Sequence, residues 1–265
     1  MKIILILLSL LPILARTQPN CNAFLYRGDT LQYRACKLVE NIDDKYYQFS
    51  KEFQEAYDEA LKICPYFSYA YREKSVAYLK SGDFLTWKEL MDKAVQYDQR
   101  GNLGYRGWCR YQFFRDYAGA IADIEKLDSL VHSDIGTGSN GDYNLDIAKA
   151  ICYSALGQKD KAVRLIEEKL KEQNYHVGLY DYYQLGVIYF ELKDYDNALR
   201  SFNKQIEINN LAEPQHYIAE IYKLRGDLKS YGEHHTLALS LFESNRRLFD
   251  PYTHHSNALF RKDYD

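Results

Sequence analysis

A motif recurs along this chain at an interval of about 34 residues, the period of a repeat made of two short helices. Its clearest copy begins at Leu179 and places apolar, aromatic or small residues three or four apart. The key positions of this copy are Tyr182, Leu185, Gly186, Tyr189, Tyr195, Ala198 and Phe202. Copies begin near residues 34, 68, 101, 143, 179 and 212. This period, with a spacing of three and four between apolar residues inside each copy, favours an all-α repeat array over residues 34–245.

Small residues near the middle of each unit are expected to let its two helices approach closely. In the Leu179 unit, we expect Gly186 of the first helix to face Ala198 of the second. The unit that begins near residue 101 has Trp108 where a small residue is expected, so close packing there requires Gly107 to take the role.

One interval between copies is longer than the rest. The copies near residues 101 and 143 are 42 residues apart, and the extra length includes the segment 134–142, rich in Gly, Ser and Asn. This segment cannot continue a helix and predicts an inserted surface loop. Its glycines stand where a calcium loop alternates carboxylates or amides, and no Gly-Lys-Ser/Thr follows, so neither a calcium loop nor a phosphate loop is predicted.

These repeats resemble the tetratricopeptide signature, from which the Leu179 unit departs by Tyr182 in place of Trp and Asn210 in place of the closing Pro. The resemblance covers roughly residues 34–245. It implies an α-solenoid of about six helix-turn-helix units wound into a right-handed superhelix. It also implies a concave groove, lined by the first helix of each pair, that binds a peptide or a partner protein. Residues 246–265 are then expected to form a capping segment and tail.

The first 17 residues have the layout of a cleavable secretory signal, with Lys2 before the apolar run 3–14 and small residues two apart after it. Cleavage is expected after Thr17, which leaves residues 18–33 as an N-terminal segment. The apolar run is shorter than the roughly 20 residues that span a membrane, although an uncleaved anchor or a buried helix stays an alternative. No later segment is apolar enough to span. We therefore expect an exported protein, periplasmic or secreted, free or associated with a bacterial envelope.

The five cysteines are an odd number, so at least one stays unpaired. Cys109 and Cys152 fall inside helical apolar patterns and are expected to be buried free thiols. In an oxidising compartment the other three can supply one disulfide, with Cys36–Cys64 and Cys21–Cys36 both left open. The residues before Cys21 do not match a lipoprotein signal, so a lipid anchor is not favoured.

No segment carries a motif for catalysis or for a cofactor. Removal of the signal would leave 32 basic against 37 acidic residues, a net charge of −5 that gives no general attraction to nucleic acid. The pairs His234-His235 and His254-His255 lack the i, i+4 spacing of helical metal ligands, so no metal site is predicted from them. The sequence favours a non-catalytic interaction scaffold. A helical-repeat hydrolase without a recognisable motif and a structural spacer of an envelope complex are the alternatives.

The predicted groove is lined by residues early in the first helix of each pair. Tyrosine and arginine suit such a surface because they combine broad contact area with directed hydrogen bonds. The alternative is that these tyrosines pack between repeats, since a chain with 26 tyrosines has more than a groove can hold. The predicted partner-binding residues are Tyr69, Arg72, Tyr105, Arg106, Asn144, Tyr180, Tyr183 and His216.

Overall fold

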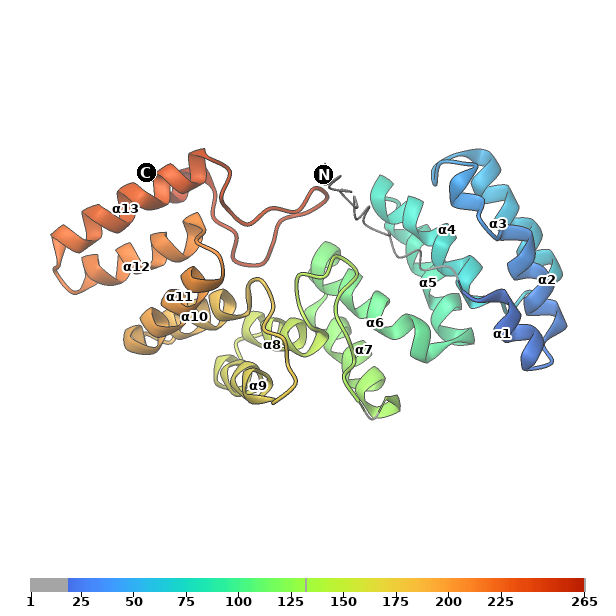
Figure 1. Cartoon of the computed structure of the whole chain (residues 1–265), viewed down its shortest axis with the longest axis horizontal. Coiled ribbons are helices and arrows are strands. Elements are labelled where there is room, and N and C mark those ends of the chain that lie inside the picture. The colour runs from blue at the N-terminus through green and yellow to red at the C-terminus, as the bar shows by residue number, and fades with distance from the viewer. Residues whose placement is uncertain (1–18, 132, 265) are drawn as a thin grey trace, which may run out of the picture. The chain divides into compact units, whose positions relative to one another are not determined.

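The computed structural model describes residues 19–131 and 133–264, so the predicted signal segment, residues 1–17, lies outside the described residues (Figure 1). The described part of the chain is helical, with thirteen α-helices and one isolated β-bridge between Thr137 and Asn144. The predicted all-α fold of paired helices is confirmed. The chain divides into two compact units: unit 1 ends at Tyr97 and unit 2 begins at Asp98.

The helices of unit 1 pack in the order in which they follow one another along the chain. They are α1 (Cys21–Tyr26), α2 (Thr30–Val39), α3 (Lys51–Ile63), α4 (Ser68–Ser81) and α5 (Phe84–Tyr97). Helix α2 packs on α3, α3 on α4, and α4 on α5. Polar caps set the starts of two of them, because Asp29 accepts a hydrogen bond from the Gln32 N–H and Ser50 accepts one from the Phe53 N–H.

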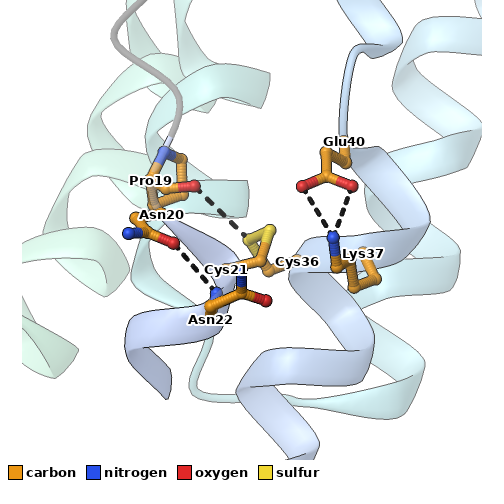
Figure 2. Close-up of a disulfide and its surroundings, with 7 residues drawn as sticks. All are labelled: Pro19, Asn20, Cys21, Asn22, Cys36, Lys37 and Glu40. Carbon is orange, nitrogen blue, oxygen red and sulfur yellow. Dashed lines mark hydrogen bonds and ion pairs between the residues drawn. A yellow bond between two sulfur atoms is a disulfide. The ribbon is translucent and has the colours of Figure 1, made fainter. Parts of the chain in front are cut away.

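A disulfide between Cys21 and Cys36 joins α1 to α2 (Figure 2), with the two Cα atoms 5.5 Å apart. Both sulfurs lie in the apolar core of unit 1, together with Phe53 and Tyr57 of α3. The structure therefore decides between the two pairings that the sequence left open. The remaining cysteines, Cys64, Cys109 and Cys152, are buried and take no part in a disulfide of the described structure, as predicted for the last two.

Unit 2 contains four helix pairs. Their first helices are α6 (Gln99–Cys109), α8 (Leu145–Ala155), α10 (Asp181–Glu191) and α12 (Ala212–Leu224). Their second helices are α7 (Tyr117–Leu130), α9 (Lys159–Lys171), α11 (Tyr195–Ile208) and α13 (Leu228–Glu243). Each first helix also contacts the first helix of the next pair, so α6, α8, α10 and α12 form one continuous layer. A π-helical turn, Arg110–Phe114, extends α6, and a short 3₁₀ helix, Arg261–Tyr264, ends the described chain.

The turns inside two of the pairs, α4–α5 and α12–α13, are built by the same two residue types, a glycine followed by an aspartate. Gly82 and Gly226 have φ of 83° and 78°, the left-handed conformation that glycine adopts at no steric cost. The next residue in each turn is an aspartate, Asp83 or Asp227, which accepts a hydrogen bond from the backbone N–H three residues on. This sequence both ends one helix and starts the next, which accounts for the short connections in the repeats.

Gly107 and Trp108 of α6 face different neighbours. A Cβ atom at Gly107 would lie 3.1 Å from the Ile124 side chain of α7, so Gly107 allows the close contact that the sequence analysis required of it. Trp108 instead packs against the inserted loop 134–142, where a Cβ atom at Gly138 would collide with the indole ring. The indole ring of Trp108 therefore packs against the inserted loop instead of separating α6 from α7.

The close approach at Gly186 differs from the predicted one. Ala198 is buried, but the three atoms nearest to a Cβ built at Gly186 all belong to the ring of Phe202, the closest at 2.5 Å. Phe202 lies one helical turn beyond Ala198 on α11, and its bulk fills the space that a side chain at Gly186 would need.

We predict that Gly186→Ala lowers the free energy of unfolding by about 1–3 kcal/mol, because the fully buried Phe202 ring cannot move away from the added methyl group. The matched control is Gly232→Ala in α13, where no atom lies within 4 Å of the added Cβ. That change should be neutral or stabilising by up to about 1 kcal/mol. Chemical denaturation measures both, and equal effects would contradict the contact.

The disulfide makes a second prediction. Replacing Cys21 and Cys36 together by serine should destabilise unit 1 by about 2–4 kcal/mol, since the closed loop spans 15 residues. A thiol reagent should label three cysteines in the unfolded, unreduced chain and five after reduction. Labelling of all five without reduction would show that the bond does not form.

Candidate functional site

The C-terminal segment, residues 246–264, is the feature that marks the candidate site. It leaves α13 as an extended loop and returns toward that helix (Figure 1). Its start is joined to α12 by a hydrogen bond from the Ala212 N–H to the Arg246 carbonyl, and its end packs against α13 through Tyr264 and Phe242. Between these points the segment runs back past the last helix pair. It contacts Gln184 of α10 and Arg115 in the turn between α6 and α7.

The segment is held through its backbone carbonyls. Gln184 of α10 donates a hydrogen bond to the Ser256 carbonyl at 3.0 Å, and the Tyr183 hydroxyl donates one to the Asn257 carbonyl at 2.5 Å. Arg115 donates to the His254 carbonyl, and also to the Ser256 hydroxyl at 3.1 Å. Three side chains of the repeat array thus bind three backbone carbonyls of a loop that turns at Ser256 and Asn257.

Side chains of the segment add contacts that depend on their identity. The Asn257 amide donates to the Gln184 side-chain carbonyl at 2.6 Å. Because the Gln184 amide also donates to the Ser256 carbonyl, Gln184 binds the segment through both of its polar atoms. His255 is only 3% exposed and lies against the rings of Tyr143 and Tyr180, with centroids 6.3 and 5.3 Å away. The Thr253 hydroxyl donates to the Gln112 carbonyl in the π-helical turn.

These contacts define a surface of unit 2 that we call the docking face. It consists of Gln112, Arg115, Tyr180, Tyr183, Gln184 and His216. Next to it, a cleft of about 490 Å³ opens between the segment and helices α8 and α10. Polar and charged side chains line much of this cleft, among them Lys159, Glu191 and His254.

A buried carboxylate fixes the start of the segment. Glu213 of α12 is fully buried and accepts a hydrogen bond from the Leu248 backbone N–H at 3.0 Å. Burial raises the pKa of Glu213 to about 7, because the charged form loses its hydration. Leu248 itself completes an apolar cluster with Phe202 and Ile218.

Three of the predicted groove residues contact the C-terminal segment. Tyr183 binds the Asn257 carbonyl, Tyr180 packs on His255, and His216 packs on Tyr264 at a centroid distance of 5.1 Å. Tyr183 is also fully buried in the core of its repeat. Tyr183 therefore packs within its repeat and also contacts the segment, and its place in a partner-binding groove stays a prediction.

The other predicted groove residues in unit 2 make contacts within the array. Arg106 forms a two-pronged ion pair with Asp123 of α7, at 2.6 and 2.9 Å, and so links the helices of its own pair. Asn144 caps α8 by accepting from the Asp146 N–H and donates to Asp134 of the inserted loop. Tyr105 packs on Trp108.

In unit 1, the structure places the two predicted groove residues beside the α3–α4 contact. Tyr69 packs against Tyr57 and Phe67 of the unit 1 core, and Arg72 lies 3.5 Å from Glu73. The residues of the docking face that the sequence analysis missed are Gln112, Arg115 and Gln184; Gln112 takes part through its backbone carbonyl, which no residue type reveals. Arg115 occupies a turn between helices, and Gln184 follows Tyr183 directly, so neither stood at a position assigned to the groove.

Comparison with known proteins identifies the repeat. Residues 182–210 match the family model described as a tetratricopeptide repeat. No curated protein sequence matches the chain. Among solved structures, PilW, a "widely conserved type IV pilus biogenesis factor", is 15% identical, with a TM-score of 0.58 over 84% of this chain and 90% of PilW.

Two further structures have the same fold. PilF of Pseudomonas aeruginosa is 13% identical, with a TM-score of 0.54 over 85% of this chain and 94% of PilF. YrrB, a "TPR protein with an unusual peptide-binding site", is 17% identical, with a TM-score of 0.51 over 71% of this chain and 91% of YrrB. Of the helices that the structure describes, none has the length and apolar character needed to cross a membrane.

The raised pKa of Glu213 predicts a pH-dependent stability. Between its ordinary value of 4.5 and about 7, the folded chain holds a proton on Glu213 that the unfolded chain has lost. The free energy of unfolding should therefore fall as pH rises through this window, by an amount on the order of 1–3 kcal/mol. Glu213→Gln should remove this part of the pH dependence while Glu233→Gln, in the next helix, leaves it. Unfolding curves at pH 5 and pH 8 make the comparison.

Proposed function

Because this chain carries a tetratricopeptide repeat within an array of the same fold, we propose that it is a non-catalytic scaffold that binds a peptide or partner protein. The binding surface is the docking face of unit 2. The observation that carries the proposal is the set of hydrogen bonds from Arg115, Tyr183 and Gln184 to three backbone carbonyls of the C-terminal segment.

The docking face presents three donors to carbonyls around a turn, because the Ala258 N–H bonds to the His255 carbonyl and Asn257 has a φ of 62°. A helix would already have paired its carbonyls internally, whereas a non-helical loop leaves most of them available. The partner we propose is therefore a non-helical stretch of protein, bound by the same three donors. The adjacent cleft, with Lys159 and Glu191 in its wall, would select polar side chains on that stretch.

The C-terminal segment competes with any such partner. Since it is attached to the array, it rebinds as an intramolecular ligand whose effective concentration is on the order of millimolar. A partner peptide must exceed this competition, or the segment must first be released. The scaffold would thus bind weakly in its closed form and more tightly once the segment has left.

We also propose that the protein is exported and acts in a bacterial envelope. Two observations support this location: the signal-like residues 1–17 and the disulfide between Cys21 and Cys36, a bond that persists in oxidising compartments. PilW, a pilus biogenesis factor by its title, has the same fold, which makes a protein complex of the envelope a reasonable place to look for the partner.

A chain with a protease site inserted after Phe249 tests the docking face. After cleavage, residues 250–265 become an exchangeable peptide, and a fluorescent peptide of the same sequence should replace them. We expect Gln184→Ala and Arg115→Ala each to weaken its binding at least fivefold, about 1 kcal/mol, because each change removes a donor to a carbonyl. The control is Gln158→Ala, an exposed position in the same unit.

The circular-dichroism signal of each variant checks that the array stays folded. Equal anisotropy titrations for all four chains, or no uptake of the peptide by the cleaved wild-type chain, would contradict the proposed binding mode.

A further inference from the structure

Three potential metal ligands converge where the inserted loop meets the C-terminal segment. Asp142 ends the loop, and Asp250 and His255 belong to the segment. One ligand atom from each lies within 4.8 Å of the other two. Nε2 of His255 lies 3.6 Å from Oδ2 of Asp142. All three residues lie outside the helices of the repeat array.

The negative charge of the two carboxylates is poorly balanced. In the described part of the chain, neither Asp142 nor Asp250 forms an ion pair with Lys or Arg. The neutral amide of Asn140 instead donates to both, at a long 3.4 Å for Asp250. Oδ1 of Asp250 also accepts from the backbone N–H groups of Tyr252 and Thr253. A cation at this point would satisfy both carboxylates.

The imidazole of His255 supplies the nitrogen of this group of ligands. The side chain is only 3% exposed, and the rings of Tyr143 and Tyr180 hold its orientation. Nε2 contacts the Phe249 carbonyl at 3.1 Å and faces Asp142, while Nδ1 is buried without a hydrogen-bond partner in the described structure. Because a carbonyl can only accept, Nε2 carries the ring proton in this contact, and metal binding at Nε2 requires that proton to move to Nδ1.

From this geometry we propose that Asp142, Asp250 and His255 form a binding site for a divalent transition metal, with Zn²⁺ or Mn²⁺ as the fitting ions. One nitrogen and two carboxylate oxygens match the ligands these ions take, whereas Ca²⁺ prefers oxygen ligands alone. With bonds of about 2.1 Å, two ligands of a tetrahedral ion lie about 3.4 Å apart, near the separation of His255 and Asp142. Binding through Nε2 replaces its contact with Phe249 and leaves the ring proton on Nδ1.

The position of the site gives the metal a structural effect. The docking face binds residues 254–257 of the segment. His255 belongs to this stretch, and Asp250 lies four residues before its start. Joining them to Asp142 fixes the segment to the array at one more point. If the proposed function holds, the metal would therefore slow exchange of the segment for a partner peptide.

Isothermal titration of the metal-free, untagged chain with ZnCl₂ and with MnCl₂ tests the site. We expect one ion per chain, and at least tenfold weaker binding in each of Asp142→Asn, Asp250→Asn and His255→Gln. The matched controls are His176→Gln and Asp128→Asn, exposed residues of unit 2, which should bind as the wild type does. MgCl₂ and CaCl₂ should bind more weakly than either transition metal.

A second measurement separates a lost ligand from a lost fold. Without metal, Asp142→Asn should be at least as stable as the wild type, because it removes a carboxylate repelled by Asp250. With Zn²⁺, the melting temperature of the wild type should rise and that of the variant should not. The site is refuted if the wild type binds neither ion at a concentration on the order of 1 mM, the weakest affinity worth assigning to a site. It is also refuted if the three variants bind the metal as tightly as the controls.

The effect on the segment is tested separately in the cleaved chain described above. Zn²⁺ should slow exchange of the fluorescent peptide in the wild type and have no effect in Asp142→Asn. If the metal binds but does not slow exchange, the proposed effect of the metal on peptide release is refuted and the metal site is upheld. Peptide exchange without metal binding would refute the site and uphold the docking face.

Discussion

A single helix pair is too small to bury its apolar face, so each pair in this fold depends on the next one for its core. The last pair of an array lacks a successor, and its exposed face needs another cover. In unit 2 the chain's own C-terminal segment supplies it: Leu248 completes the cluster around Phe202 and Ile218, and Tyr264 packs beside Leu241. Except for the short 3₁₀ helix at its end, the cover is a loop, which lets it continue along the layer of first helices.

This arrangement combines a stabilising cover with a ligand-like contact. The apolar ends of the segment, at Leu248 and Tyr264, lie over the last pair, whereas its polar middle lies on α10 and the turn after α6. The apolar contacts stabilise the array whether or not the middle is bound. The middle, held mainly by hydrogen bonds, can therefore open without loss of the core, as the low-stability parts of a protein commonly do.

The local features of the fold could be predicted from the sequence, and the long-range ones could not. Helix positions follow from periodicity, and the turns follow from pairs such as Gly226-Asp227, because each depends on residues a few positions apart. The place of Gly107 followed for the same reason. The partner of Gly186 was wrong by one helical turn, since the register between two helices is set by how their side chains interlock. The path of the C-terminal segment depends on Arg115 and Gln184, over 70 residues away from their partners in the chain. The cluster of Asp142, Asp250 and His255 has no spacing in the sequence that could reveal it.

The number of residues in the π-helical turn Arg110–Phe114 determines which side chain contacts the C-terminal segment. Its last hydrogen bond runs from the Arg115 N–H to the Arg110 carbonyl, five residues back, so the turn holds one residue more than an α-helical turn would. Removal of any one residue there would rotate everything that follows by about 100° and bring a neighbour to the position of Arg115. Insertions and deletions at this turn would therefore change which side chain meets the C-terminal segment, whereas substitutions within it would leave that choice unchanged. Among related chains, the number of residues in this turn would be a better guide to binding specificity than their identity.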